Sequence, residues 1–341
     1  MLEALSASYL AYRRCPAVKA TVFSESYVRA FNLRNDSWHV RVKFLGTSSA
    51  VPTNDRGLPA ILVKTAGDSI LLDCGEGTQR QMIRGRESIM NINKIVITHL
   101  HGDHFFGLFP LIQTLGILRR SSELNVIGPK GLEPLLSSIL ERTGSKPQFR
   151  VIFSEIEVGK EIELGKFRLE FFKVDHNDFE TYGVKLREKD RPGEFDPKKA
   201  DELGVPIFMR GFLQRGFTVK LPDGRLVSPS DVMGPPRRGP VVVYSSDTRP
   251  TKSVIEASKE ADLLIHEATY LDELKERAVS TGHSTALEAG EVAEASGVKK
   301  LVLTHFSARY SDEDLPKFQE EASRVYGGDV IIARDFSTID I

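Results

Sequence analysis

The stretch THLHGDH at residues 98–104 places three of the chain's eight histidines and one aspartate within seven residues. A loop that leaves a strand can direct alternate side chains into one cavity, so His99, His101, Asp103 and His104 can converge there. Imidazole and carboxylate groups bind Zn²⁺ without thiolates, and Mn²⁺ or Fe²⁺ can use the same ligands. Isolated histidines would be ordinary surface or core residues, but this combination predicts a metal site.

Further ligands for a second metal ion follow apolar strands later in the chain. His176 ends FRLEFFKVDH, Asp247 ends VVVYSSD, and His305 ends LVLTH. Each alone has an ordinary explanation, because polar residues often close strands and Asp247 could cap a helix. Together they complete a set of histidines and carboxylates. The chain has only two cysteines, too few for a thiolate metal site or a disulfide framework.

The elements that must position these residues alternate between strand and helix from Val40 onward. VRVKFL, AILV, SILLD and KIVIT read as strands, and the apolar spacing after the histidine cluster predicts a helix. This order favours an α/β fold with mixed sheets covered by helices, a four-layer αββα sandwich in one domain, residues 39–341. Residues 1–38 show no clear period and are interpreted as an N-terminal extension of unknown role.

Residues 187–239 differ from the rest in their content of proline, glycine and charge, which predicts an inserted, protruding arm, although a plain linker would have a similar composition. Between Phe208 and Arg238, six basic residues stand against two acidic ones. On charge alone, a solvated face explains this surplus better than a binding surface does.

The overall composition limits the classes of function. A net charge of -1 argues against a protein that coats nucleic acid by bulk electrostatics, but it allows a local basic groove. No apolar run reaches the ~18 residues that a membrane helix needs, and the N-terminus lacks the pattern of a signal peptide. We therefore expect a cytoplasmic protein with no membrane segment.

Two sets of motifs carry a resemblance. THLHGDH, with LLDCGEGTQRQ upstream and the later strand-end ligands, resembles the metallo-β-lactamase fold of dinuclear hydrolases. FLGTSSAVPT, LIHEATY, TGHSTA and THFSARY, in this order, resemble more narrowly the ribonuclease Z family of tRNA 3' processing endonucleases. The resemblance implies an endoribonuclease that removes the 3' trailer of precursor tRNA after the discriminator nucleotide and leaves a 3'-hydroxyl.

The resemblance also implies roles for individual residues. It implies two Zn²⁺ per subunit, one on His99, His101 and His176, the other on Asp103, His104 and His305, with Asp247 bridging both. Asp103 would also orient the attacking water. His283 in GHST would protonate the leaving 3'-oxygen, and Glu267 in HEAT would orient His283. Without the resemblance, His283 as a helix cap and Glu267 as the partner of a backbone group are equally good explanations.

For the arm, the resemblance implies a grip on the tRNA elbow through backbone phosphates, with Arg210, Arg215 and Lys220 as candidate contacts. It further implies a homodimer in which the arm of one subunit serves the site of the other. Two alternatives remain open. A metallo-β-lactamase-fold phosphodiesterase acting on a small phosphodiester would need no long arm, and a non-catalytic RNA-binding protein would be expected to have lost ligands.

Overall fold

The computed structural model describes residues 40–65 and 67–341, and Val40–Ile341 forms one compact unit. The predicted N-terminal extension, residues 1–38, lies outside the described residues. Within the described part of the chain, no helix is long and apolar enough to cross a membrane.

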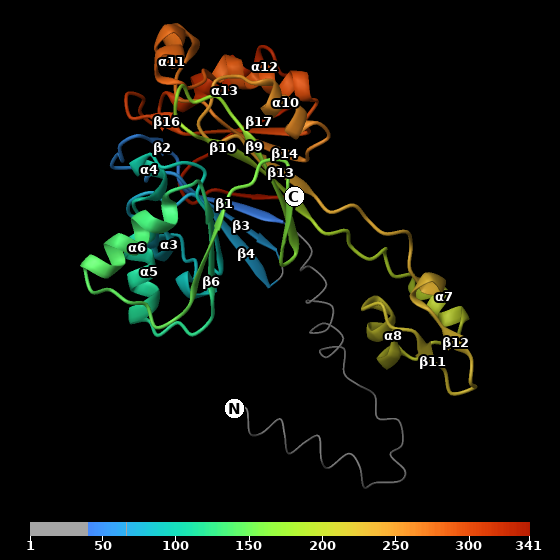
Figure 1. Cartoon of the computed structure of the whole chain (residues 1–341). Helices are drawn as coiled ribbons and strands as arrows, with labels where there is room; N and C mark the ends of the chain where they lie inside the picture. Colours follow the sequence, from blue (N-terminus) through green and yellow to red (C-terminus); the bar gives the residue numbers. More distant parts are fainter. Residues whose placement is uncertain (1–39, 66) are drawn as a thin grey trace. The chain divides into compact units, whose positions relative to one another are not determined.

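Two seven-stranded mixed sheets form the centre of this unit (Figure 1). The first sheet consists, in spatial order, of β18 (Thr338–Asp340), β1 (Arg41–Gly46), β3 (Ala60–Thr65), β4 (Asp68–Leu72), β5 (Lys94–Val96), β6 (Leu124–Gly128) and β7 (Val151–Glu155). The second consists of β17 (Asp329–Ile332), β15 (Lys300–Thr304), β14 (Leu263–Glu267), β13 (Val241–Tyr244), β10 (Tyr182–Glu188), β9 (Phe167–Lys173) and β8 (Glu161–Leu164).

The core between the sheets takes alternate residues from both. Val42 and Phe44 of β1 join one apolar cluster with Phe171 of β9 and Val242 of β13. Strand β13, VVVY, is buried along its whole length, as expected for a strand covered on both faces. Burial of both inner faces therefore fixes the register, because a slip by one residue would turn each apolar set outward.

Helices cover the outer face of each sheet, and two further apolar clusters lie under them. The helices over the first sheet are α3 (Thr78–Arg84), α4 (Gly102–Phe105), α5 (Leu108–Ile117) and α6 (Leu132–Arg142), with the 3₁₀ helix η1 (Ile89–Asn91) beside them. Those on the second sheet's side are α10 (Lys252–Ser258), η2 (Asp272–Leu274), α11 (Lys275–Thr281), α12 (Ala286–Ser296) and α13 (Leu315–Ser323). The predicted αββα sandwich is confirmed.

The strand directions bring the ends of several strands to one side of the second sheet. Strands β13, β14 and β15 are parallel neighbours. Strand β9 runs in the same direction, because both β9 and β13 are antiparallel to β10. In the first sheet, β4 and β5 are likewise parallel. The loops that follow the carboxyl ends of such strands are the usual place for a site in an α/β fold.

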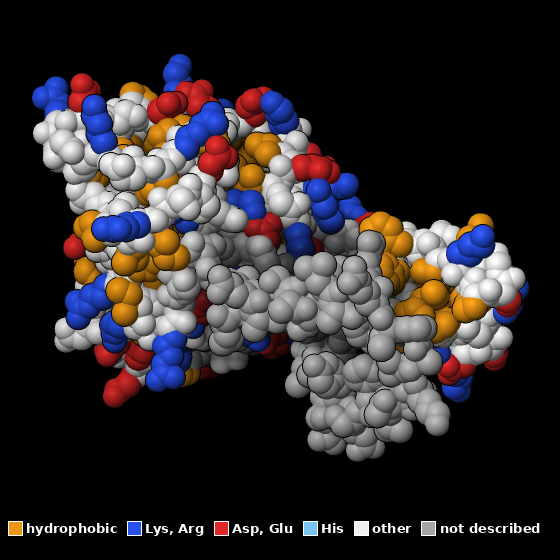
Figure 2. Space-filling view, turned by 90° about the horizontal axis from the view of Figure 1, so that it is seen from below, with side chains coloured by type: hydrophobic (Ala, Val, Ile, Leu, Met, Phe, Trp, Pro, Cys, Tyr) orange, Lys and Arg blue, Asp and Glu red, His pale blue; other side chains and the backbone are white. Residues whose placement is uncertain are grey.

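Residues 187–239 contain more regular structure than their composition indicates. They form α7 (Pro197–Glu202), α8 (Ile207–Gln214) and α9 (Pro229–Val232), with a two-stranded sheet of β11 (Val219–Lys220) and β12 (Leu226–Val227). These elements enclose their own apolar cluster, which includes Leu213 and Val232. A plain linker would have no such core. Figure 2 shows hydrophobic side chains gathered on this segment, and its exposed members are Ile207, Phe208, Phe212, Phe217 and Leu226.

A second short pair of strands lies next to His305, one of the candidate ligands. β2 (Ser48–Ser49) pairs in parallel with β16 (Phe306–Ser307), directly after His305. The pair joins the loop that follows β1 to the loop that follows β15.

Candidate active site

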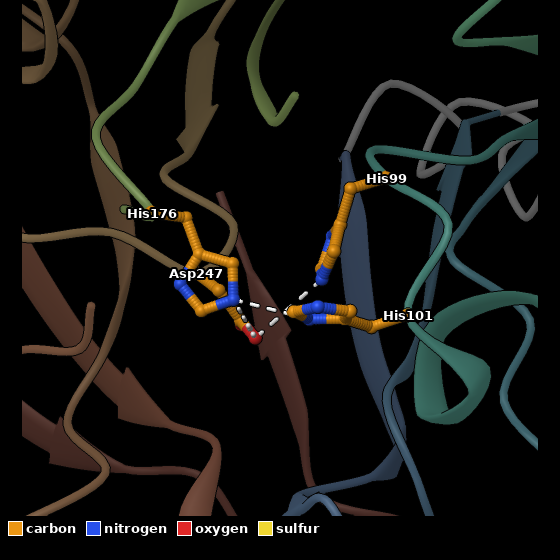
Figure 3. A group of neighbouring side chains, drawn as sticks. All are labelled: His99, His101, His176 and Asp247. Atoms are coloured by element: carbon orange, nitrogen blue, oxygen red, sulfur yellow. Dashed lines mark hydrogen bonds and ion pairs between the residues drawn. The ribbon is translucent and has the colours of Figure 1, made fainter. Parts of the chain in front are cut away.

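All seven candidate ligands converge at the carboxyl ends of these strands. The His99, His101 and His104 side chains come from the loop and first turn after β5, whereas His176, Asp247 and His305 follow strands of the second sheet. Groups of these residues have ligand atoms that all lie within 4.8 Å of one another, namely His99, His101, His176 and Asp247, and separately Asp103, His104 and His305. Figure 3 shows the first group, with its rings directed toward the Asp247 carboxylate.

Asp247 lies between the two groups and faces both. Its Oδ2 atom is 3.7 Å from His99 Nε2 and 3.2 Å from His104 Nε2. Its Oδ1 atom is 3.3 Å from His305 Nε2. The one carboxylate is thus within reach of both clusters, which is the arrangement that a bridging ligand needs.

The second nitrogen of several rings is fixed by an oxygen acceptor. His104 Nδ1 lies 2.8 Å from Asp73 Oδ2, and His176 Nδ1 lies 2.8 Å from the carbonyl oxygen of Gly282. An oxygen acceptor requires the proton on Nδ1, so in the neutral ring the lone pair is on Nε2, which faces the cluster. Gly282 has a φ of 73°, and a Cβ here would lie only 3.0 Å from atoms of Asn177 and His176, so a side chain would be strained.

His305 is oriented by a longer chain of hydrogen bonds. Thr269 Oγ1 donates to Glu267 Oε2 at 2.7 Å, which leaves the hydroxyl oxygen free to accept from His305 Nδ1 at 3.0 Å. His305 also has a φ of 64°, in the left-handed region that non-glycine residues rarely adopt. A backbone held in this conformation is a feature of functional sites, where the surrounding structure enforces it.

The electrostatics of the cluster suit a divalent cation. Burial lowers the pKa of His104, but the carboxylates of Asp247, Asp103 and Asp73 raise it well above its ordinary value. The same carboxylates therefore favour positive charge between them. Two buried atoms in the cluster, His99 Nε2 and Asp247 Oδ1, also have no hydrogen-bond partner among the described residues. Such atoms are costly to bury unless something binds them, and a metal ion satisfies both.

His283 and Glu267 form a separate pair at the edge of the cluster. His283 Nδ1 lies 2.8 Å from Glu267 Oε1. Burial lowers the pKa of His283, but the Glu267 carboxylate more than offsets this and the net pKa rises to about 9. Because Nδ1 is committed to Glu267, Nε2 is the atom left for a substrate. His283 therefore lines the cavity with Nε2 as its uncommitted ring nitrogen, and Glu267 favours its protonated form.

The structure also tests the two simpler explanations for this pair, His283 as a helix cap and Glu267 as the partner of a backbone group. Helix α12 is capped by Thr285, whose side chain accepts from the Glu288 N–H at 3.2 Å, so His283 is not the cap. Glu267 does bond backbone groups, since it accepts from the N–H of Thr248 and of Thr269 at 3.0 Å each. These bonds hold the carboxylate in place beside His283, so the two functions of Glu267 are compatible.

An open cavity of about 570 Å³ gives access to the cluster. Its lining includes His101, Asp103, His176, Asp247 and His283, together with Ser49, Ala50, Val51, Pro52, Leu58, Glu76, Gly102, Phe106 and Thr281. A cavity of this size admits a phosphodiester with its flanking groups. The site therefore has the components of a metal-dependent hydrolase: a ligand cluster, an adjacent histidine–carboxylate pair, and an open approach.

Comparison with known proteins agrees with this geometry. The chain is 42% identical over 306 residues to the ribonuclease Z of Archaeoglobus fulgidus, a match that covers 88% of this chain and 97% of the relative. It is 41% identical over 303 residues to the ribonuclease Z of Myxococcus xanthus, with 89% and 98% covered. The chain belongs to the ribonuclease Z family. The resemblance to this family seen in the sequence motifs is thus confirmed.

Family models and a solved structure support the same placement. A model described as "Beta-lactamase superfamily domain" matches residues 231–306, and one described as "Anti-Pycsar protein Apyc1" matches residues 40–191. The crystal structure of the short form of human tRNase Z aligns with a TM-score of 0.64 at 27% identity, covering 88% of this chain and 98% of that one. This member of the ribonuclease Z family thus has the metallo-β-lactamase fold.

One buried residue beside the candidate ligands, Asp73, was not predicted from the sequence. Asp73 is fully buried directly after β4, where it accepts from the Thr98 N–H at 2.8 Å, from Tyr244 Oη at 2.9 Å, and from His104 Nδ1. The signal was available, since SILLD closes an apolar strand with an aspartate just as VVVYSSD does. Asp73 is directed at a candidate ligand instead of at the cavity.

The three residues predicted to contact RNA from the arm differ in their contacts within the protein. Arg210 donates to the Asp201 carboxylate and, at 3.1 Å, to the carbonyl oxygen of Val205, so it ties α8 to α7. Arg215 lies over the ring of Phe212, 4.8 Å from its centroid. Lys220 is exposed on β11 and has no acidic partner within the described part of the chain. Arg215 and Lys220 are therefore available to a ligand, and Arg210 is engaged within the arm.

Proposed function

We propose that this member of the ribonuclease Z family is a zinc-dependent endoribonuclease that removes the 3' trailer from precursor tRNA. It hydrolyses the phosphodiester after the discriminator nucleotide and leaves a 3'-hydroxyl. The observation that carries the proposal is the combination, in one cavity, of a two-part ligand cluster and the Glu267–His283 pair. Relatives named ribonuclease Z that match along nearly their whole length support the choice of substrate.

Two Zn²⁺ ions per subunit would occupy the cluster, with Mn²⁺ or Fe²⁺ as other candidates. The proposed ligands are His99, His101 and His176 for one ion, Asp103, His104 and His305 for the other, and Asp247 for both. When bound, such ions stabilise negative charge on the phosphate oxygens and make a water molecule more acidic. The donor set of imidazoles and carboxylates suits these metals.

Asp103 would orient the attacking water, and His283 would supply a proton to the leaving group. Asp103 Oδ2 accepts from the Ala50 N–H at 2.8 Å. Burial raises the pKa of Asp103, but His104 and His305 lower it further below its ordinary value, so the carboxylate is ionised at neutral pH and can orient a water. The attacking water would lose one proton to the solvent. As its oxygen bonds to phosphorus, the bond to the ribose 3'-oxygen would break, and that oxygen would take a proton from His283 Nε2.

The arm would supply specificity for RNA. Arg215 and Lys220 are placed to contact backbone phosphates, which would make binding dependent on salt. Arg210 would act indirectly, by holding α8 in place. We further propose that the enzyme is a cytoplasmic homodimer.

The test is incubation of the purified protein with a precursor tRNA that carries a labelled 3' trailer, with a chelator-treated sample alongside. We expect a single cut just past the discriminator nucleotide that disappears with the chelator and returns with Zn²⁺. An intact precursor together with hydrolysis of a small phosphodiester would instead favour the alternative, a small-molecule phosphodiesterase. Binding of the precursor with no hydrolysis of either would favour a non-catalytic RNA-binding protein.

A further inference from the structure

Arg249 follows Asp247 by two residues and has its guanidinium largely buried, with 15% of the side chain exposed. The guanidinium forms a two-pronged ion pair with Glu288, with Nη1 at 2.7 Å from Oε2 and Nη2 at 2.5 Å from Oε1. Nη1 also donates to the backbone carbonyl oxygen of His283. A charged group on the Asp247 segment thus holds the backbone of the proposed proton donor.

Glu288 has a second contact on the same loop. It is the third residue of α12, and its Oε2 accepts from the N–H of Thr285 at 3.0 Å in a capping box. A capping box satisfies the helix terminus by itself and needs no arginine. Burial of an added ion pair is weak evidence for stability, because desolvation offsets the attraction. A role in placing the His283 loop explains the extra arginine better.

Backbone bonds around Arg249 connect two further segments of the site. The Arg249 N–H donates to the carbonyl oxygen of Asp175, next to His176, at 2.6 Å. On the other side, Ser284 Oγ donates to the carbonyl oxygen of Thr248 at 2.6 Å. Residues 247–249 therefore join the loop of a candidate ligand to the loop of the proton donor.

We infer that Arg249 and Glu288 are positioning residues that fix the imidazole of His283 relative to Asp247 and the scissile bond. This inference rests on the proposed function, in which His283 protonates the leaving oxygen. The Glu267 bond fixes the rotation of the ring through Nδ1, but the location of the ring depends on its backbone. That backbone follows Gly282, which has a φ of 73° and ends α11. The His283 N–H is held by the carbonyl oxygen of Ala278 at 2.8 Å, but its own carbonyl group is held by Arg249, so loss of that contact lets the donor shift.

The consequence is specific to proton donation. A displacement of about 1 Å can cost two orders of magnitude in rate, and a general acid contributes about 10²- to 10⁴-fold. A leaving group that departs without a proton should escape this loss. Misplacement of His283 therefore predicts a defect that depends on the leaving group, whereas general unfolding or loss of metal would affect all substrates.

The experiment compares two precursor tRNAs that differ in one atom, with oxygen or sulfur as the 3' leaving atom at the scissile bond. Full-length, Zn²⁺-loaded protein is tested as wild type, Arg249→Gln, Glu288→Gln and His283→Asn under single-turnover conditions. For Arg249→Gln we expect cleavage of the oxygen substrate to slow by about 10- to 100-fold, and cleavage of the sulfur substrate to change by less than about threefold. Glu288→Gln should show the same pattern more weakly, because Gln retains the size and one acceptor.

Arg324→Gln is the matched control, because Arg324, exposed at the end of α13, pairs with the exposed Glu320, and the substitution should leave both rates unchanged. Equal losses on both substrates in Arg249→Gln, or no loss at all, would overturn the inference. A His283→Asn variant that slows both substrates equally would instead remove the proposed role of His283. Arg249→Lys gives a second check, since it keeps the charge, loses the two-pronged contact, and should recover only part of the oxygen-substrate rate.

Discussion

At the scale of single residues, the site depends on groups that never face the cavity. Asp73 accepts four hydrogen bonds from three residues, and one of them orients His104. Glu267 accepts hydrogen bonds from two backbone N–H groups in addition to its contact with His283. His104 and His283 are therefore each held by a carboxylate that is itself held by other residues, so the supporting residues can be tested separately from the histidines.

The first prediction concerns Asp73→Asn. Asparagine keeps the size of the side chain but replaces one acceptor oxygen by a donor, so the bond that fixes His104 weakens. We expect the affinity for Zn²⁺ to fall by about 10- to 100-fold, as measured by competition with a chelating dye. Activity should return with excess Zn²⁺. Unchanged affinity would mean that Asp73 supports the fold alone.

Asp103→Ala makes the complementary prediction at the cavity. Because Asp103 is partly exposed there and its partners are Ala50, His104 and His305, its loss should abolish cleavage of precursor tRNA without unfolding the protein. The cleavage assay and circular dichroism together check this. Normal turnover in the variant would refute the mechanism.

Asp335 provides a prediction on pH and stability that is independent of the metal cluster. It accepts from Thr47 Oγ1, the Gly57 N–H and Gln81 Nε2, yet burial raises its pKa to about 6. The pKa in the folded state is above that in the unfolded state, about 3.9. The resulting stabilisation is complete below about pH 4 and is lost as the pH rises through about 6.

Asp335→Asn should remove this dependence, because Asn stays neutral. The free energy of unfolding of the wild type should therefore fall relative to that of the variant between pH 4 and 6. The upper limit is roughly 3 kcal/mol, since one pKa unit corresponds to about 1.4 kcal/mol. Urea unfolding of both proteins across this range measures the difference, and other titrating groups cancel in it. Parallel pH curves would contradict the raised pKa.

At the scale of secondary-structure elements, the arm combines an internal core with exposed ligand-binding candidates. We predict that Arg215→Ala and Lys220→Ala each weaken binding of precursor tRNA and reduce its salt dependence by about one counterion. Hydrolysis of a small phosphodiester should not change. Arg210→Ala should instead lower the stability of the arm, because it breaks the contacts between α7 and α8. Fluorescence anisotropy at several salt concentrations tests binding, with the exposed Lys259→Ala as control.

The elements also show which features a single sequence reveals. Strands such as β5 (Lys94–Val96) and β13 (Val241–Tyr244) were predictable from their apolar runs, and the His or Asp that follows each run identified a candidate ligand. The helices of the arm were not predicted, although Asp196 followed by Pro197 is a strong start signal for α7. The pairing of β18 with β1 had no local signal, because it joins the two ends of the domain. Local pattern identifies the candidate ligands, whereas long-range packing decides which side chains support them.

At the scale of the whole domain, the ligand cluster joins the two sheets. His99, Asp103 and His104 belong to the first sheet's loops, and His176, Asp247 and His305 belong to the second's. Two buried atoms at this junction, His99 Nε2 and Asp247 Oδ1, have no hydrogen-bond partner among the described residues. A bound metal ion should therefore stabilise the folded state as a cross-link between the sheets.

The last prediction follows from this junction. A ligand that binds only the folded state stabilises it by about 2.7 kcal/mol at a concentration 100 times its Kd, so removal of the metal should lower the Tm of the wild type by several degrees. In His305→Ala, which lacks one ligand, the starting Tm should be lower and the chelator should have a smaller effect. Differential scanning calorimetry with and without chelator measures both. A chelator effect of equal size in wild type and variant would mean that metal binding does not depend on His305. A Tm that the chelator changes in neither protein would mean that the sheets are held together by their apolar core alone.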